Sequence, residues 1–90
     1  MRQELFTVDD VFKMEERRGI VVVGDHQADF LEPKLGSAIV MILPDSTERI
    51  KKVGGIDIFS TVSGIKKIGI LVKNLTKEDV PVGTKIFLKT

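Results

Sequence analysis

The sequence predicts a small all-β protein whose short antiparallel strands form a barrel or a sandwich. Apolar runs rich in valine and isoleucine recur along the chain, and clusters of glycine, proline, aspartate and serine separate them. Residues 56–59 alternate with a period of two, which is typical of a half-buried strand. Ninety residues have the size of one domain, so we expect a single unit spanning residues 1–90.

The extended runs follow one another without a long helical segment between them. The first two runs share an extended opening around the acidic pair at residues 9–10, and the pattern as a whole corresponds to five to seven short strands. Side chains branched at Cβ are frequent in these runs, which favours strands. The runs are residues 5–8, 11–14, 20–23, 38–43, 48–53, 56–59, 68–72 and 85–88.

Turn residues mark where these strands end. Residues 15–19 predict a turn in which Gly19 is free to take a positive φ angle. Thr76 and Asp79 match the capping-box pattern and predict one short helical turn. Pro81 ends that turn, because proline disfavours helical geometry at the residue before it. Gly83 then permits the reversal into the last strand.

Composition narrows the class of protein. The formal net charge of +1 gives no general attraction to nucleic acid, and the absence of cysteine excludes a disulfide framework. Apolar residues make up 42% of the chain and charged residues 30%, which favours a folded globular domain over disorder. The sequence shows no signal peptide and no apolar run long enough to span a bilayer. We therefore expect a cytoplasmic protein that does not insert into a membrane.

Two phrases at opposite ends of the chain carry a family resemblance. Residues 10–24 begin with an Asp-Val-Phe strand and continue through an Arg-Gly turn into a valine-rich strand. Residues 64–87 contain an apolar strand, one helical turn and a Pro-x-Gly exit into another strand. Together they resemble the second domain of elongation factor Tu and related translation GTPases, here as a stand-alone domain. The resemblance implies a closed antiparallel Greek-key barrel of six or seven strands, without the GTPase part.

The resemblance also marks a pocket, which in elongation factor Tu helps to hold the aminoacylated end of transfer RNA. Asp57 stands at the position of the family's pocket glutamate, and Phe59 matches the phenylalanine two residues further on. Ser60 replaces the basic residue that usually follows, and Lys67 replaces an asparagine before the last apolar strand. We regard the pocket as degenerate and expect no preference for aminoacylated transfer RNA.

Catalytic and cofactor motifs are absent from the sequence. It contains no G-x-x-x-x-G-K-[ST] phosphate loop, so we expect neither GTP nor ATP to bind. His26 is the only histidine, and without cysteine it predicts no recognisable metal site. No nucleophile, acid and base stand in a recognisable pattern. We therefore expect a protein that is not an enzyme and that uses no cofactor.

Three small basic groups are candidates for contact with RNA or the ribosome. If they share one face, each phosphate that they neutralise adds salt-dependent affinity. The acidic residues are almost as numerous, and tyrosine and tryptophan are absent, so ordinary solvated strand faces are the alternative. The candidate residues are Arg17, Arg18, Arg49, Lys51, Lys52, Lys66 and Lys67, with Lys73 beside the last pair.

The strand at residues 38–43 is apolar at both parities. One parity fills the interior of a barrel, so we expect Ala38, Val40 and Ile42 to face outward as a candidate interface. An exposed aliphatic row of this kind favours a protein partner or self-association. The alternative is that another part of the chain, such as residues 27–33, covers the row.

These observations lead to two hypotheses of different kinds. The first is a non-catalytic binding module that acts through its outer surface on a protein or RNA of the translation apparatus. The second is a homo-oligomeric protein-interaction adaptor unrelated to translation. The initial Met1 favours a complete small gene product over an excised domain, and the sequence leaves both open.

Overall fold

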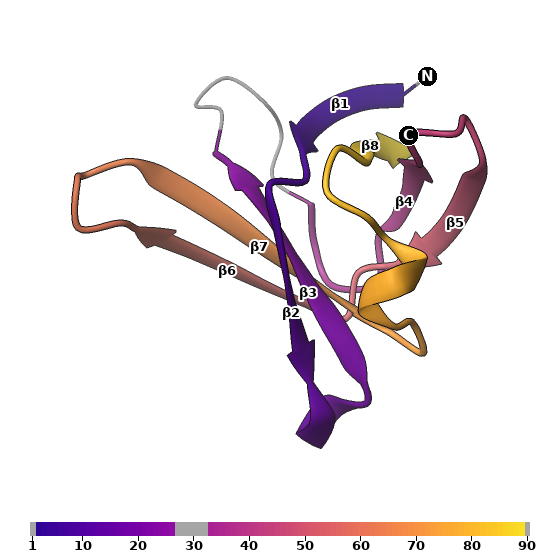
Figure 1. Ribbon diagram of the computed structural model, residues 1–90, viewed down its shortest axis with the longest axis horizontal. Coiled ribbons are helices and arrows are strands. Elements are labelled where there is room, and N and C mark those ends of the chain that lie inside the picture. The colour runs from indigo at the N-terminus through magenta and orange to yellow at the C-terminus, as the bar shows by residue number, and fades with distance from the viewer. Residues whose placement is uncertain (1, 27–32, 90) are drawn as a thin grey trace.

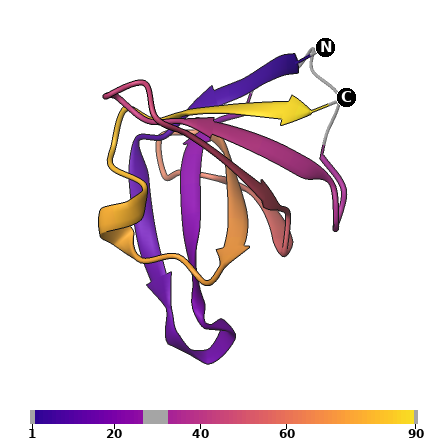
Figure 2. The same ribbon diagram turned by 90° about the vertical axis from the view of Figure 1, so that its right-hand side faces the viewer.

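The computed structural model describes residues 2–26 and 33–89, and these form an all-β fold of two four-stranded antiparallel sheets (Figure 1). The first sheet has the strand order β1-β8-β4-β5 and the second β2-β3-β7-β6. Figure 2 shows the first sheet from its outer side, with β8 between β1 and β4. The strands are β1 (Arg2–Thr7), β2 (Asp10–Met14), β3 (Gly19–Asp25), β4 (Ala38–Ile42), β5 (Glu48–Lys52), β6 (Gly55–Ser60), β7 (Lys66–Lys73) and β8 (Lys85–Lys89).

Each of the runs predicted from the sequence is a strand, and the all-β class is confirmed. The described residues contain eight strands rather than six or seven, because residues 9–10 divide the extended opening between the two sheets. Alternate residues of both sheets point inward and form one hydrophobic core. Its fully buried members include Phe6, Ile20, Ile39, Met41, Ile68, Ile70 and Ile86.

The chain passes from the first sheet to the second at two places where backbone hydrogen bonds continue. Between β1 and β2, the Val8 N–H donates to the Thr84 carbonyl and the Asp9 N–H donates to the Val23 carbonyl, both at 2.8 Å. Between β5 and β6, the Val53 N–H donates to Ser37 and the Gly54 N–H to Leu71. Residues 53–54 are therefore the second passage between the sheets.

The turn after β2 differs from its prediction. A 3-10 helix, η1 (Glu15–Arg17), forms there, and the residue with a positive φ angle is Arg18, at 52°, not Gly19. Gly19 is required for another reason. A Cβ atom at this position would lie 2.4 Å from the carbonyl oxygen of Val72 on the neighbouring strand. The glycine allows β3 and β7 to approach closely, and Arg18 makes the turn.

The predicted helical turn is confirmed as the 3-10 helix η2 (Lys77–Asp79). The Asp79 carboxylate accepts hydrogen bonds from the backbone N–H and the hydroxyl of Thr76, at 2.8 and 3.1 Å. Gly83 has a φ angle of 99° and makes the expected reversal.

Within the part of the chain that the structure describes, no helix is long and apolar enough to cross a membrane.

The expected exposure of Val40 is wrong. Its side chain is 0% exposed, and Ala38 and Ile42 are half-buried. In the strand register Val40 lies between Ile50 of β5 and Phe87 of β8, and it is fully buried there although it is outside the core cluster. The apolar side chain that this face exposes is Ile50, at 54%. The loop proposed to cover the row, residues 27–33, lies outside the described residues except for Pro33, which is buried.

Candidate binding pocket

The outer face of the second sheet is apolar across all four strands. Phe12 of β2 lies opposite Val21 of β3, which lies opposite Leu71 of β7, which lies opposite Gly55 of β6. Paired residues point to the same side of a sheet, so these positions form one row on the face turned away from the core. The sheet thus presents a second apolar surface.

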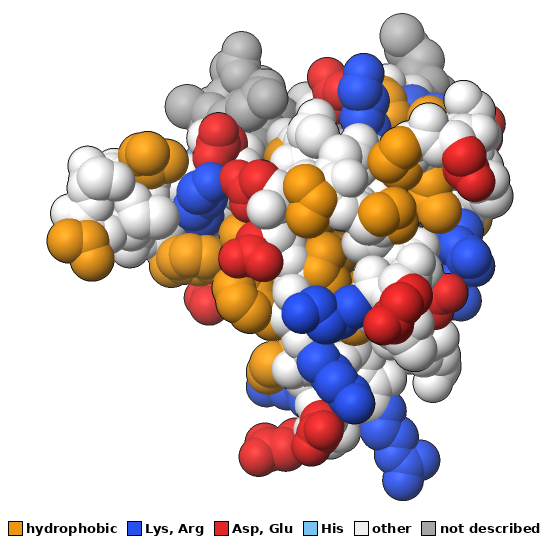
Figure 3. Space-filling model, viewed as in Figure 1, with side chains coloured by type: hydrophobic (Ala, Val, Ile, Leu, Met, Phe, Trp, Pro, Cys, Tyr) orange, Lys and Arg blue, Asp and Glu red, His pale blue; other side chains and the backbone are white. Residues whose placement is uncertain are grey.

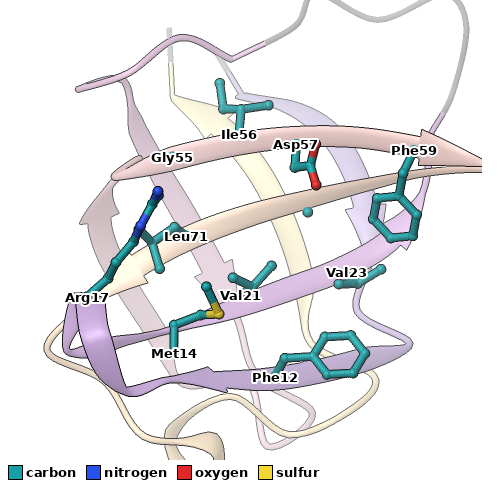
Figure 4. Close-up of a pocket in the computed structure, with 11 residues that line it drawn as sticks. Phe12, Met14, Arg17, Val21, Val23, Gly55, Ile56, Asp57, Phe59 and Leu71 are labelled. Carbon is teal, nitrogen blue, oxygen red and sulfur yellow. The ribbon is translucent and has the colours of Figure 1, made fainter.

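A pocket of about 450 Å³ is hollowed into this face (Figure 4). Val23 and Leu71 form part of its floor and are only 4% and 3% exposed. Phe12, Met14 and Phe59 line its sides and are 50%, 37% and 39% exposed. Phe12 and Phe59 come from the two edge strands, β2 and β6, and the figure shows Val23 between their rings. The edges are therefore aromatic and the middle is aliphatic.

Asp57 is the one acidic residue among the described residues that line the pocket. Asp57 is opposite Gly69 in the strand register, and its side chain is exposed. Gly69 has no side chain, so the pocket floor is open at this position. A Cβ atom there would take up that space and would lie 2.9 Å from Cγ1 of Val21. Among the described residues, Asp57 makes no hydrogen bond or ion pair with another side chain.

A cation lies at the other end of the pocket. Arg17 extends from η1 toward β6, where its Nη1 would lie 3.5 Å from a Cβ atom at Gly55. Gly55 and Asp57 are two residues apart on one strand, a spacing of about 7 Å. No ion pair joins Arg17 to a described residue. The pocket therefore has a negative group and a positive group set apart along β6.

Lys67 is held in an ion-pair cluster beside the pocket. Its Nζ lies 2.5 Å from Oδ2 of Asp9 and 2.6 Å from Oδ1 of Asp25, and only 18% of its side chain is exposed. Hydrogen bonds first to Asp25 and then to Asp9 raise the pKa of Lys67 above its ordinary value. The cluster joins β7 to β3 and to the passage between β1 and β2. Three residues were marked as pocket positions by the resemblance. Asp57 and Phe59 line the pocket, whereas Lys67 lies opposite Phe59 in the strand register and is ion-paired with Asp9 and Asp25.

The basic residues proposed for RNA contact lie in three separate places. Arg17 and Arg18 are at η1, whereas Lys66 and Lys67 begin β7 at the far end of the second sheet. The third group, Arg49, Lys51 and Lys52, is on β5 of the first sheet, where Arg49 lies 3.7 Å from the Asp79 carboxylate. Figure 3 shows cationic and acidic side chains interspersed over one face.

Sequence reasoning missed the side of the pocket formed by β2. The alternation in residues 10–14 places Phe12 and Met14 on the opposite face from the buried Val11. The available signal was the neighbouring run at residues 20–23, which is apolar at both parities. When both faces of a strand are apolar, the face turned away from the core favours contact with another part of the protein or with a ligand. In this run Val21 and Val23 are on that second face and line the pocket.

The described residues contain no cluster of three or more histidine, cysteine or acidic side chains able to hold a metal ion. His26 follows β3, where its backbone N–H donates to the Lys66 carbonyl at 3.0 Å.

The chain matches no protein-family model, and no curated protein is significantly similar to it.

Proposed function

We propose that this chain is a non-catalytic binding module of the type seen in the second domain of translation elongation factors. On this proposal the two sheets are halves of a closed Greek-key barrel, and the two passages between sheets are its corners. The backbone hydrogen bonds that continue through Val8, Asp9, Val53 and Gly54 support closure, because they leave little free edge at the corners.

The module binds its partner through the outer face of β2-β3-β7-β6. The observation that carries this proposal is the pocket of about 450 Å³, whose sides include the half-exposed Phe12, Met14 and Phe59. Full burial of an exposed side chain of this kind is worth about 1.5–3 kcal/mol, and each of these half-exposed side chains would gain part of that value in a complex. Asp57 and Phe59, the positions that match the family's pocket, lie in it.

We infer that the partner is a protein of the translation apparatus. Apolar surface flanked by aromatic rings favours a protein contact, since such side chains are enriched at the centres of protein interfaces. RNA is the second candidate, and it has less support because the basic groups lie in three places and Lys67 is bound by two acids.

Co-sedimentation with ribosomes and soluble translation factors from the native host tests this function. Two variants are compared. Phe59→Ser removes an aromatic side of the pocket, and Ile50→Ser removes an apolar side chain of the other sheet that is more exposed, at 54% against 39%. We expect Phe59→Ser to abolish co-sedimentation with a translation component and Ile50→Ser to leave it unchanged. Equal loss in both variants, or no association of the natural chain, would contradict the proposal.

A homo-oligomeric adaptor unrelated to translation is the second candidate function. The observation that favours it is the apolar tip of the β6–β7 hairpin, where Val62 is 110% exposed and Ile65 is 51% exposed. Figure 1 shows this hairpin extending from the body of the fold. Sedimentation at high micromolar concentration separates the two candidates: a species larger than 10.0 kDa supports the adaptor, and a monomer excludes self-association.

A further inference from the structure

We propose that the pocket binds an arginine side chain of the partner protein, held by Asp57 between Phe12 and Phe59, and this inference rests on the function proposed above. The charge of the pocket is the first argument. Among the described residues that line it, Asp57 is the only acid, and it forms no ion pair with a described residue, Arg17 being placed beside Gly55 at the other end of the pocket. The nearest lysine on this face in the strand register, Lys67, is bound to Asp9 and Asp25.

The apolar surroundings of Asp57 select the kind of cation. A long side chain with a charged end can lay its methylene groups along Val23 and Gly69 and present its charge to the carboxylate. Phenyl rings on two sides favour a cation over a neutral group, because the ring face attracts positive charge. Among cationic side chains, arginine stacks on aromatic rings and donates two parallel hydrogen bonds to a carboxylate. These features favour arginine over lysine.

Arg17 indicates what lies next to that arginine in the partner. Its guanidinium lies beside Gly55, about 7 Å along β6 from Asp57. In an extended segment, residues two apart point to the same side and have the same spacing. A partner segment with an arginine followed or preceded at two residues by an acidic side chain would therefore satisfy Asp57 and Arg17 together. The occupant is an extended peptide segment with this pair of charges.

Titration of the isotope-labelled protein with two synthetic peptides tests the inference. The probe is the blocked peptide acetyl-Ser-Leu-Arg-Leu-Glu-Ser-amide, and its control carries citrulline, which has the shape of arginine without the charge. We expect the arginine peptide to shift amide resonances of β6 and β7 and to bind at least about tenfold more tightly than the control. We expect the same tenfold loss when Asp57→Asn is titrated with the arginine peptide.

Equal affinity for the two peptides, shifts outside this sheet, or no binding would each overturn the inference. The same holds if an oligoribonucleotide, but neither peptide, shifts the resonances of the pocket. The matched variant Asp10→Asn removes an acid at the edge of the same face and should keep full affinity. If Phe59→Ser loses partner binding and Asp57→Asn keeps it, the proposed binding module is supported and the proposed arginine ligand is wrong.

Discussion

Asp57 of β6 lies directly opposite Gly69 of β7, so the carboxylate stands over the one position of the pocket floor where β7 has no side chain. This pairing keeps an open volume beside a charge. A larger residue at position 69 would fill that volume from below, because a Cβ atom there already lies 2.9 Å from Cγ1 of Val21. The pocket thus depends on a glycine whose φ angle is not positive.

We predict that Gly69→Ala closes part of the pocket while the protein stays folded. The atom that the new methyl group meets is the end of the Val21 side chain, which can move. The free energy of unfolding should therefore change by about 1 kcal/mol or less, while affinity for the arginine peptide falls about tenfold. Thermal melts and the peptide titration measure the two effects. Unchanged affinity would show that the ligand does not use the floor.

Gly19→Ala should have the opposite profile. Its Cβ atom would lie 2.4 Å from the backbone oxygen of Val72, and backbone cannot move aside without separating β3 from β7. We expect the free energy of unfolding to fall by about 1–3 kcal/mol, the cost of forcing atoms into a packed site. Urea unfolding of Gly19→Ala and Gly69→Ala side by side provides the comparison. Equal stability of the two variants would contradict the close approach of these strands.

Val40→Glu should unfold the protein, in contrast to Ile50→Glu. Val40 is 0% exposed, so a glutamate there buries an unpaired charge and should cost about 4 kcal/mol or more. Ile50 is its cross-strand neighbour but is 54% exposed, so the same substitution should cost about 1 kcal/mol or less. Circular dichroism and urea titration distinguish the variants. A folded Val40→Glu protein would restore the original outward assignment.

The ion-pair cluster of Lys67 should appear in the dependence of stability on pH. Asp25 and Asp9 raise the pKa of Lys67 in the folded state above the ordinary value of about 10.4. Its contribution is therefore complete below that value and is lost as the pH rises through the folded pKa. We expect the Tm of the natural chain to fall more steeply above about pH 10 than the Tm of Lys67→Met.

At neutral pH the Lys67→Met variant should itself melt at a lower temperature, because Asp9 and Asp25 then face each other without a cation. Differential scanning calorimetry from pH 7 to 11 measures both effects. Parallel curves for the two proteins across this range would mean that the cluster does not contribute to stability.

The local pattern of this chain determined most of its strands. The alternation at residues 56–59 predicted a half-buried strand, and in the structure Ile56 and Ile58 pack against the core while Asp57 and Phe59 line the pocket. Residue type also located the helical turn that Asp79 caps. Such signals are short-range, and a sequence displays them directly.

What escaped prediction depends on contacts between strands far apart in the sequence. Val40 was expected to face outward, and only the folded structure, in which it lies between Ile50 and Phe87 in the strand register, shows that it is buried. The sequence alone presents Lys67 as a free cation. Its ion pairs form only because the fold brings Asp25 of β3 and Asp9 of the β1–β2 passage next to it. The pocket likewise needs β2 and β6, the two edges of one sheet, and no spacing rule joins their side chains.

Photo-crosslinking from inside the pocket determines whether the outer face of β2-β3-β7-β6 is the binding surface. A benzophenone amino acid would replace Phe59 in the pocket or Ile50 on the other sheet, and both variants would be irradiated in the native host. Mass spectrometry would identify the crosslinked molecule. We expect one protein of the translation apparatus to be crosslinked from position 59 and to be absent from position 50. The same products from both positions, or crosslinks from position 50 alone, would contradict it.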